Sequence, residues 1–185
     1  MESIRILGTG SYVPPKRLTN DDLQKMGLDT TDEWIRKRTG VVERRIADPD
    51  VTAADLGCAA SRKALEAAGL TAKDIDLIIM ATITPDTCCP SAANWLQAKL
   101  DAPQAVTFDV TAACSGFIFG LNVAEQYLKN KTFKRILVVA SEIMSRTLNW
   151  QDRFGNYTVV IQRDEAGHRT VITLARTGAR TPGKR

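Results

Sequence analysis

The apolar segment at residues 76–82 constrains the fold of this chain more than any other feature. It is nearly continuous, without the polar alternation of a half-exposed strand, and it lies between two helical patterns. Such a run is typical of a strand covered on both faces, as in parallel sheets. Further strands are expected at 106–110 and 135–141, each reached through a helical segment. The sequence therefore predicts a layered α/β fold with a mostly parallel sheet and right-handed crossovers.

The remaining elements follow from apolar spacing and from helix start and stop signals. In the helix at 52–68, Thr52 is the predicted cap and Gly69 the predicted end, and further helices are expected at 91–100 and 115–129. Ahead of them we expect a strand at 3–8, a helix at 20–26 capped by Asn20, and a helix at 31–38 ending at Gly40. The Gly-x-Gly at 8–10 lacks the third glycine and the helix of a phosphate loop, so it is interpreted as a turn.

The net charge of +4 belongs to the end of the chain. Residues 154–185 hold six basic and two acidic side chains, whereas the first 153 residues are balanced. Because aromatic residues are not interleaved with these basic ones, we expect a solvated tail and no nucleic-acid binding. The apolar stretches are too short to span a bilayer and the start lacks a signal peptide, so we expect a cytoplasmic protein without a membrane segment.

Cysteine spacing excludes several classes of site. The four cysteines form no Cys-x-x-Cys pair and the chain has one histidine, His168, so neither a zinc site nor a disulfide framework is expected. At least one thiol remains a candidate for catalysis. Cys58, within the predicted helix 52–68, fits a small buried residue instead.

Cys114 has the strongest catalytic pattern. It lies in Ala113-Cys114-Ser115-Gly116, where the strand at 106–110 passes into the helix at 115–129. Small neighbours permit a tight turn of the nucleophile-elbow kind and leave the sulfur open. A helix N-terminus favours thiolate over thiol, and the thiolate exchanges acyl groups with thioesters. From spacing alone, a small core residue at a tight turn remains the alternative.

Several separated motifs resemble the 3-oxoacyl-[acyl-carrier-protein] synthase III family. They are Gly-Thr-Gly-Ser-Tyr-Val-Pro at 8–14, Asp-Glu-Trp-Ile at 32–35 with Arg-Thr-Gly at 38–40, Pro-Ser-Ala-Ala at 90–93, and Asp-Val-Thr-Ala-Ala-Cys-Ser-Gly-Phe at 109–117. The resemblance covers about residues 3–153 and implies the N-terminal half-domain of a layered, thiolase-like fold. It also implies that Cys114 takes the acyl group of an acyl-CoA primer, which is then condensed with malonyl-acyl-carrier protein to start fatty-acid synthesis.

The same resemblance implies roles for further residues. Trp34 matches a tryptophan that stacks on the CoA adenine, and Arg38 and Arg153 match arginines at the CoA nucleotide. Thr30 matches a threonine at the mouth of the same CoA site. Cys89 matches the loop position that reaches the acyl pocket of the partner subunit. Acyl-CoA is thus the expected substrate, with no separate cofactor or metal. Acyl carrier protein and a second copy of the chain are the expected partners.

The family's condensation step uses a histidine and an asparagine from its second half, which this chain does not contain. His168 is not expected to replace that histidine. We therefore divide the chain into a thiolase-like half at 1–153 and a divergent basic tail at 154–185, with a hairpin at 157–162 and 169–174 followed by disorder. A frameshift near Arg153 and a genuine short protein are the two explanations. The alternative function is a catalytically incomplete CoA-binding or interaction module.

Overall fold

A three-stranded parallel sheet forms the centre of the larger of two units in the computed structural model. The structure describes residues 4–148, 150, 157–163 and 170–176. The larger unit contains residues 45–144 together with the N-terminal segment up to Lys16. Its strands are β3 (Leu77–Ala81), β4 (Val106–Val110) and β5 (Ile136–Ala140), in the order β4-β3-β5. Leu77 pairs with Val106 on one side and with Ile136 on the other.

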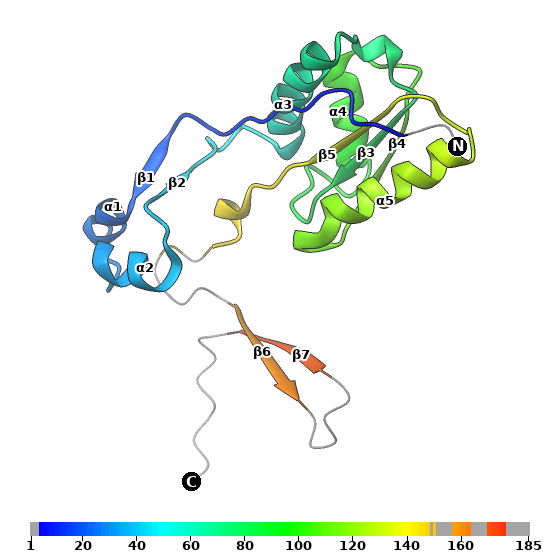
Figure 1. Cartoon of the computed structure of the whole chain (residues 1–185). Coiled ribbons are helices and arrows are strands. Elements are labelled where there is room, and N and C mark those ends of the chain that lie inside the picture. The colour runs from blue at the N-terminus through cyan, green and yellow to red at the C-terminus, as the bar shows by residue number, and fades with distance from the viewer. Residues whose placement is uncertain (1–3, 149, 151–156, 164–169, 177–185) are drawn as a thin grey trace. The chain divides into compact units, whose positions relative to one another are not determined.

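Helices cover both faces of this sheet, which confirms the layered α/β prediction (Figure 1). They are α3 (Ala53–Ala68), α4 (Ala92–Leu100) and α5 (Gly116–Lys129). Ile78 and Met80 of β3 belong to the apolar cluster with α3 and α4, whereas Leu77 and Ile79 pack with α5. All five residues of β3 are buried because successive side chains meet a helical layer on opposite faces.

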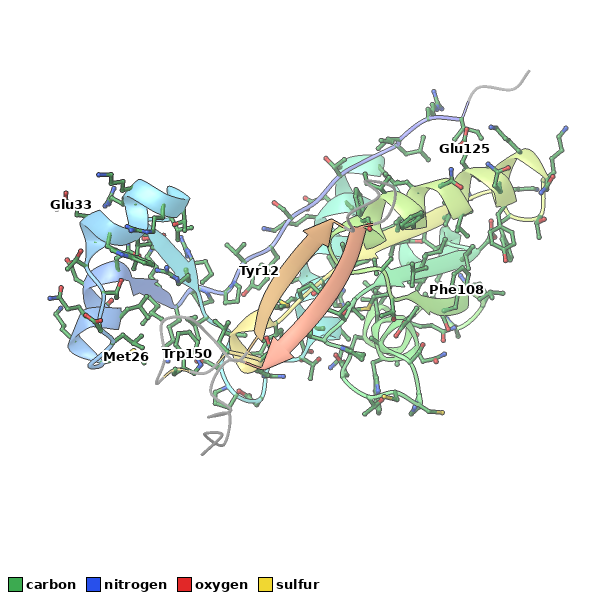
Figure 2. The ribbon with its side chains drawn as sticks, turned by 90° about the horizontal axis from the view of Figure 1, so that it is seen from below. Tyr12, Met26, Glu33, Phe108, Glu125 and Trp150 are labelled. Atoms are coloured by element: carbon green, nitrogen blue, oxygen red, sulfur yellow. The ribbon has the colours of Figure 1, made fainter. Side chains whose placement is uncertain are left out.

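The cluster beneath α5 includes aromatic side chains from β4, from α5 and from the loop after α5. Phe108 of β4, labelled in Figure 2, lies 6.5 Å from Tyr127 of α5 between ring centroids, and Tyr127 lies 5.2 Å from Phe133. Tilted aromatic pairs at these separations add to the stabilisation from apolar burial. They fix α5 over the sheet at the end away from the β4–α5 turn.

The helix ends in this unit follow the predicted signals. Thr52 caps α3 through its side chain, which accepts from the Asp55 backbone, while Asp55 accepts from the Thr52 backbone. Gly69 ends α3 in the left-handed conformation with φ 65°. Ser91 caps α4 in the same way with Asn94. A short 3₁₀ turn, Ala72–Asp74, precedes β3.

The predicted strand at 3–8 is wrong over residues 4–8, which form no strand. Gly8 and Gly10 instead lie against the backbone of α3. A Cβ atom on Gly8 would stand 2.4 Å from the Ala64 carbonyl oxygen, and one on Gly10 would stand 2.3 Å from that of Ala60. The Gly-x-Gly is therefore a close-approach motif that lets the N-terminal segment cross the helix.

Lys63 of α3 makes two further contacts with the same segment, after the glycines. The Lys63 ammonium lies 5.6 Å from the centre of the Tyr12 ring, which Figure 2 labels, and donates to the Ser11 carbonyl at 3.0 Å.

The smaller unit contains residues 17–44 and the chain from Ser145 onward. Its N-terminal part pairs β1 (Arg17–Thr19) with β2 (Glu43–Arg45) and includes α1 (Asn20–Lys25) and α2 (Asp32–Thr39). The prediction that Asn20 caps α1 is wrong, since Thr19 accepts from the Asp22 backbone at 3.2 Å. The predicted end of α2 at Gly40 is confirmed.

Asn20 is buried inside this unit instead, with an exposed fraction of 1%. Its amide nitrogen donates to the Asp32 carboxylate at 2.8 Å and to the Val41 carbonyl at 2.9 Å. Its amide oxygen accepts from the Arg44 guanidinium at 2.6 Å. One amide therefore joins the start of α1, the start of α2 and the strand β2.

Beyond residue 150 the structure describes an antiparallel hairpin of β6 (Tyr157–Arg163) and β7 (Thr170–Arg176). Strand β6 ends one residue later than the sequence pattern suggests, and β7 starts one residue later and ends two residues later. Arg153, His168 and the tail from residue 177 onward lie outside the described residues. No helix among the described residues is long and apolar enough to cross a membrane.

Candidate active site

Cys114 lies on the turn between β4 and α5, as the sequence predicts. A 3₁₀ turn at Ala113–Ser115 separates the two elements, and the Cys114 thiol is exposed and free. Because β4 is parallel to its neighbour β3, this turn lies at the carboxyl edge of the sheet, where ligand sites of α/β proteins commonly lie.

The backbone before Cys114 is strained. Ala113 has a φ of 45°, in the left-handed region that residues with a Cβ rarely adopt. Hydrogen bonds of Ser115 hold the turn, since both its backbone nitrogen and its hydroxyl donate to the Ala112 carbonyl, at 3.2 and 2.9 Å. Strained residues of this kind concentrate at functional sites, where the surrounding structure enforces them.

Two glycines bring the start of α5 close to the sheet. A Cβ atom on Gly116 would stand 3.1 Å from the Ala81 Cβ, and one on Gly120 would stand 3.0 Å from a Val138 methyl group. Larger residues would lift the helix from β3 and β5. The glycine after Cys114 therefore positions the turn, a role beyond the open access that the sequence pattern suggests.

The N-terminus of α5 is not capped by a side chain among the described residues. Ser115 is the N-cap residue, but its hydroxyl donates backwards to Ala112 and makes no side-chain bond to the helix. The first turn of α5 therefore directs its backbone dipoles towards the region of Cys114. An anion or a developing oxyanion is stabilised by such a helix start.

The neighbouring strand ends are joined by a network that the sequence patterns did not reveal. Glu142 follows β5 and accepts hydrogen bonds from the backbone nitrogens of Ile83 and Thr84, at 2.9 and 3.1 Å, and from the Thr84 hydroxyl at 2.6 Å. The Thr111 hydroxyl donates to the Thr82 carbonyl at 3.4 Å. These bonds tie the loop after β3 to the ends of both neighbouring strands.

Two aspartates on this edge bind helix starts. Asp109, at the end of β4, accepts from the backbone nitrogens of Ala92 and Ala93 at 2.9 and 2.8 Å, and Asp86 accepts from Ala54 at 3.0 Å. Carboxylates at helix N-termini complement the helix dipole. The aspartate of the motif at 109–117 therefore anchors α4 to β4, the strand that leads into the Cys114 turn.

The other three cysteines differ in their exposure to solvent. Cys58 is buried in α3 with its sulfur 3.6 Å from the Lys99 carbonyl oxygen, which confirms its prediction as a small packing residue. Cys88 and Cys89 are exposed in the loop between β3 and α4. Among the described residues, no three histidine, cysteine or acidic side chains come together as a metal-binding group.

Of the residues assigned to CoA, the three that the structure describes, Thr30, Trp34 and Arg38, fall in the smaller unit. Trp34 and Arg38 lie one turn apart on α2, with the guanidinium carbon 4.2 Å from the centre of the indole ring. Thr30, just before α2, is 8% exposed, and its buried hydroxyl has no hydrogen-bond partner in the described structure. The structure thus brings Trp34 and Arg38 into contact, whereas Cys114 belongs to the other unit.

Two neighbours, Arg36 and the buried amide of Asn20, favour the ionised form of the Asp32 carboxylate at the start of α2. The Arg36 side chain, 2.7 Å from the carboxylate, is the main cause that lowers the pKa of Asp32, and Asn20 adds to the effect. Burial lowers the pKa of Arg44, whose guanidinium bonds to Asn20. Helix α2 therefore begins at a carboxylate that stays ionised well into the acidic range.

The parallel sheet with helices on both faces and a cysteine on its strand-to-helix turn defines a thiolase-like α/β protein. A sequence model of 3-oxoacyl-[acyl-carrier-protein (ACP)] synthase III matches residues 108–175. The chain is 51% identical over 162 residues to a beta-ketoacyl-[acyl-carrier-protein] synthase III of Caldanaerobacter subterraneus, covering 88% of this chain and 48% of the relative. A synthase of the same name from Xanthomonas campestris is 51% identical over 163 residues and is covered to 49%.

Solved structures agree with the sequence matches. The crystal structure of 3-oxoacyl-[acyl-carrier-protein] synthase III from Aquifex aeolicus superimposes with a TM-score of 0.78 at 35% identity, over 94% of this chain and 64% of that one. The priming beta-ketosynthase of the R1128 polyketide pathway gives 0.77 at 40% identity, over 80% and 44%. The chain belongs to the 3-oxoacyl-[acyl-carrier-protein] synthase III family and spans about half the length of the curated relatives it matches. The predicted boundary at Arg153 stays a prediction, and the family match continues past it.

Proposed function

We propose that this chain is the acyl-accepting half of a cytoplasmic ketoacyl synthase III type acyltransferase, with Cys114 as its nucleophile. The exposed thiol on the β4–α5 turn is the observation that carries the proposal. Its thiolate attacks the thioester carbonyl of an acyl-CoA, the bond from the carbonyl carbon to the CoA sulfur breaks, and CoA leaves as the free thiol after taking up a proton. The acyl group remains on Cys114.

The start of α5 supports this chemistry electrostatically. Its dipole stabilises the oxyanion that forms during attack, and the Ser115 hydroxyl does not compete for the helix start. The strained Ala113 and the close packing of Gly116 hold the sulfur at the sheet edge. The site needs no metal or separate cofactor for this step, because acyl-CoA is itself the substrate.

Binding of the primer is assigned to the residues that the family resemblance identifies. Trp34 and Arg38 offer an aromatic face and a guanidinium, which suit an adenine and a phosphate. The buried, unpartnered hydroxyl of Thr30 supports a polar ligand near the start of α2. Arg153 is proposed to contact the same nucleotide, and Cys89 to enter the acyl pocket of a partner subunit.

The second substrate is proposed to be malonyl-acyl-carrier protein, whose decarboxylated carbanion would attack the acyl-Cys114 thioester. Because the family takes two donors for that step from its second half, we expect this chain to accept acyl groups without condensing them. On α5, Phe117, Ile118 and Phe119 are between 43% and 65% exposed. This apolar surface supports contact with further protein, either a second half-domain or another copy of the chain.

Intact mass spectrometry after incubation with acetyl-CoA tests the proposal. We expect one acetyl group per chain, located on the Cys114 peptide and absent from Cys114→Ala. In a coupled assay with malonyl-acyl-carrier protein, we expect no ketoacyl product above that of the same variant. Binding of CoA without an acetyl adduct would instead identify an interaction module, and ketoacyl product would show that the second half is dispensable.

Alkylation provides an independent test of the nucleophile. Brief treatment with iodoacetamide at neutral pH should label Cys114 faster than Cys88 and Cys89, which are also exposed, because of these three thiols only Cys114 lies at a helix start. Buried Cys58 serves as the slow reference. Faster labelling of Cys88 or Cys89 in the folded chain would contradict the assignment.

A further inference from the structure

Cys88 and Cys89 are consecutive thiols in the loop between β3 and α4. Both side chains are exposed and neither forms a disulfide. Cys88 has no part in the proposed acyl transfer, and Cys89 is proposed only to enter the acyl pocket of a partner subunit. Two adjacent accessible thiols are a chemical feature in their own right, because together they can act as a bidentate soft ligand.

Their spacing disfavours a direct bond between the two sulfurs. Consecutive Cα atoms across a trans peptide lie about 3.8 Å apart, whereas disulfides usually join Cα atoms about 4.4 to 6.8 Å apart. A disulfide between neighbours would be strained and easily reduced. A ligand atom between the sulfurs removes this constraint, because it replaces one bond of about 2.05 Å with two longer ones. The pair is thus kept as a dithiol that suits a bridging centre.

Hydrogen bonds hold the loop on both sides of the pair. The Thr87 hydroxyl donates to the Pro90 carbonyl, so the residues before and after the two cysteines are joined. The indole nitrogen of Trp95, on α4, donates to the same hydroxyl at 2.8 Å. A loop that is already ordered loses less conformational entropy when a ligand engages both thiols.

The number of donors selects the kind of ligand. Since no group of three or more histidine, cysteine or acidic side chains is found among the described residues, four-coordinate zinc would lack protein ligands at this loop. A trivalent centre that already carries one organic group needs two further bonds, which two thiolates supply.

We propose that Cys88 and Cys89 form a dithiol site for thiophilic trivalent ligands, of which monosubstituted arsenicals are the representative class. With an arylarsenoxide, two arsenic–sulfur bonds form, the oxygen leaves as water with both thiol protons, and arsenic stays trivalent. The proposal does not rest on the acyl-transfer function. A partner subunit that covers Cys89 and an arsenical on the pair are mutually exclusive occupants.

Phenylarsine oxide and intact mass spectrometry test the site on the full chain. We expect one phenylarsenic group per chain in the unchanged protein and in Cys114→Ser, with two protons lost on binding. The adduct should survive an excess of 2-mercaptoethanol and be removed by a dithiol such as 2,3-dimercaptopropanol. Loss of either thiol, in Cys88→Ser or Cys89→Ser, should weaken binding about a hundredfold or more, as expected when a second attachment is lost.

The controls separate this site from the other thiols. Circular dichroism checks that each serine variant is folded, and iodoacetamide labelling of Cys114 is a second check in the variants that keep this residue. An adduct of undiminished affinity in the double variant Cys88→Ser, Cys89→Ser would overturn the proposal. Loss of the adduct in Cys114→Ser, or its removal by 2-mercaptoethanol as readily as by the dithiol, would overturn it as well.

Discussion

The sheet unit and the segment Arg17–Arg44 are held together by different interactions. In the former, all of β3 is buried between helical layers on two faces. In the latter, Leu23 and Ile35 are the buried hydrophobic side chains, and the amide of Asn20 makes the central contacts. The proposed nucleophile therefore lies on a scaffold fixed by apolar burial, whereas the proposed nucleotide contacts lie on one fixed by hydrogen bonds.

The largest effect should come from truncating the centre of the sheet. Ile79 is fully buried beneath α5, so Ile79→Ala should lower the free energy of unfolding by about 2–5 kcal/mol. Chemical denaturation followed by circular dichroism measures it. Val106→Ala, at a half-exposed position on β4, is the matched control and should change little. Equal losses for both variants would show that the sheet is not the stabilising core.

A smaller and more local loss is expected in the other region. Asn20→Ala leaves the Arg44 guanidinium without its amide partner and frees the Val41 carbonyl, at a cost of about 1–3 kcal/mol. Hydrogen exchange should accelerate in α1 and α2 and stay unchanged in β3. Asn130→Ala, at an exposed position after α5, is the control. Faster exchange throughout β3 would refute the independence of the two regions.

Because CoA binding is assigned to one region and acyl transfer to the other, a substitution at Trp34 should weaken acetyl-CoA binding without preventing acylation of Cys114. Removing one aromatic face from a stacked base costs about 1–3 kcal/mol, so Trp34→Ala should raise the acetyl-CoA concentration for half-maximal labelling of Cys114 by about 5- to 150-fold. The maximum extent of labelling should not change. Trp95→Ala, in α4, is the control: it removes an indole that is not assigned to CoA, and it should leave the half-maximal concentration unchanged. A lower maximum with unchanged half-saturation would contradict the assignment of Trp34.

The smallest effect concerns the pH dependence of α2. Because Arg36 and then Asn20 lower the pKa of Asp32, its ionised form stabilises the folded state above its ordinary pKa of 3.8, and this stabilisation is lost as the pH falls through the lower folded value. Asp32→Asn should therefore differ from the unchanged protein at pH 7 and converge with it as the pH falls through the lowered folded pKa of Asp32. Exchange rates of α2 amides, corrected for intrinsic rates, measure the difference. A constant difference across that range would exclude titration of Asp32 as its cause.

Prediction from sequence succeeded where one residue pattern has one physical solution. The apolar run at 76–82 could be buried on two faces only with helices on both, and Thr52 and Gly69 are strong helix signals, so β3 and α3 were predicted nearly to the residue. It failed at Gly8 and Gly10, because no local pattern tells a turn from a close approach to a distant helix backbone. It also misplaced the cap of α1, since Thr19 and Asn20 are both good caps and burial decided between them.

In the candidate site, too, residues within local motifs were predicted and long-range contacts were not. Cys114 was found from small residues at a predicted strand-to-helix turn, and Trp34 and Arg38 from family motifs one helical turn apart. The Glu142 network was missed, because its partners lie about sixty positions earlier in the chain and share no spacing with it. Arg153 and the tail remain predictions, as they lie outside the described residues.

By itself, the sequence determined the order of the elements from α3 to β5, the start and end of α3, and the turn that presents Cys114, because these depend on side-chain periodicity and on short-range hydrogen bonds. Tertiary structure alone decided that Asn20 is buried, that Gly116 meets Ala81, and that Glu142 joins the strand ends. The physical reason is distance along the chain. Such contacts form between segments brought together by apolar burial, and no local pattern specifies which polar groups then become neighbours.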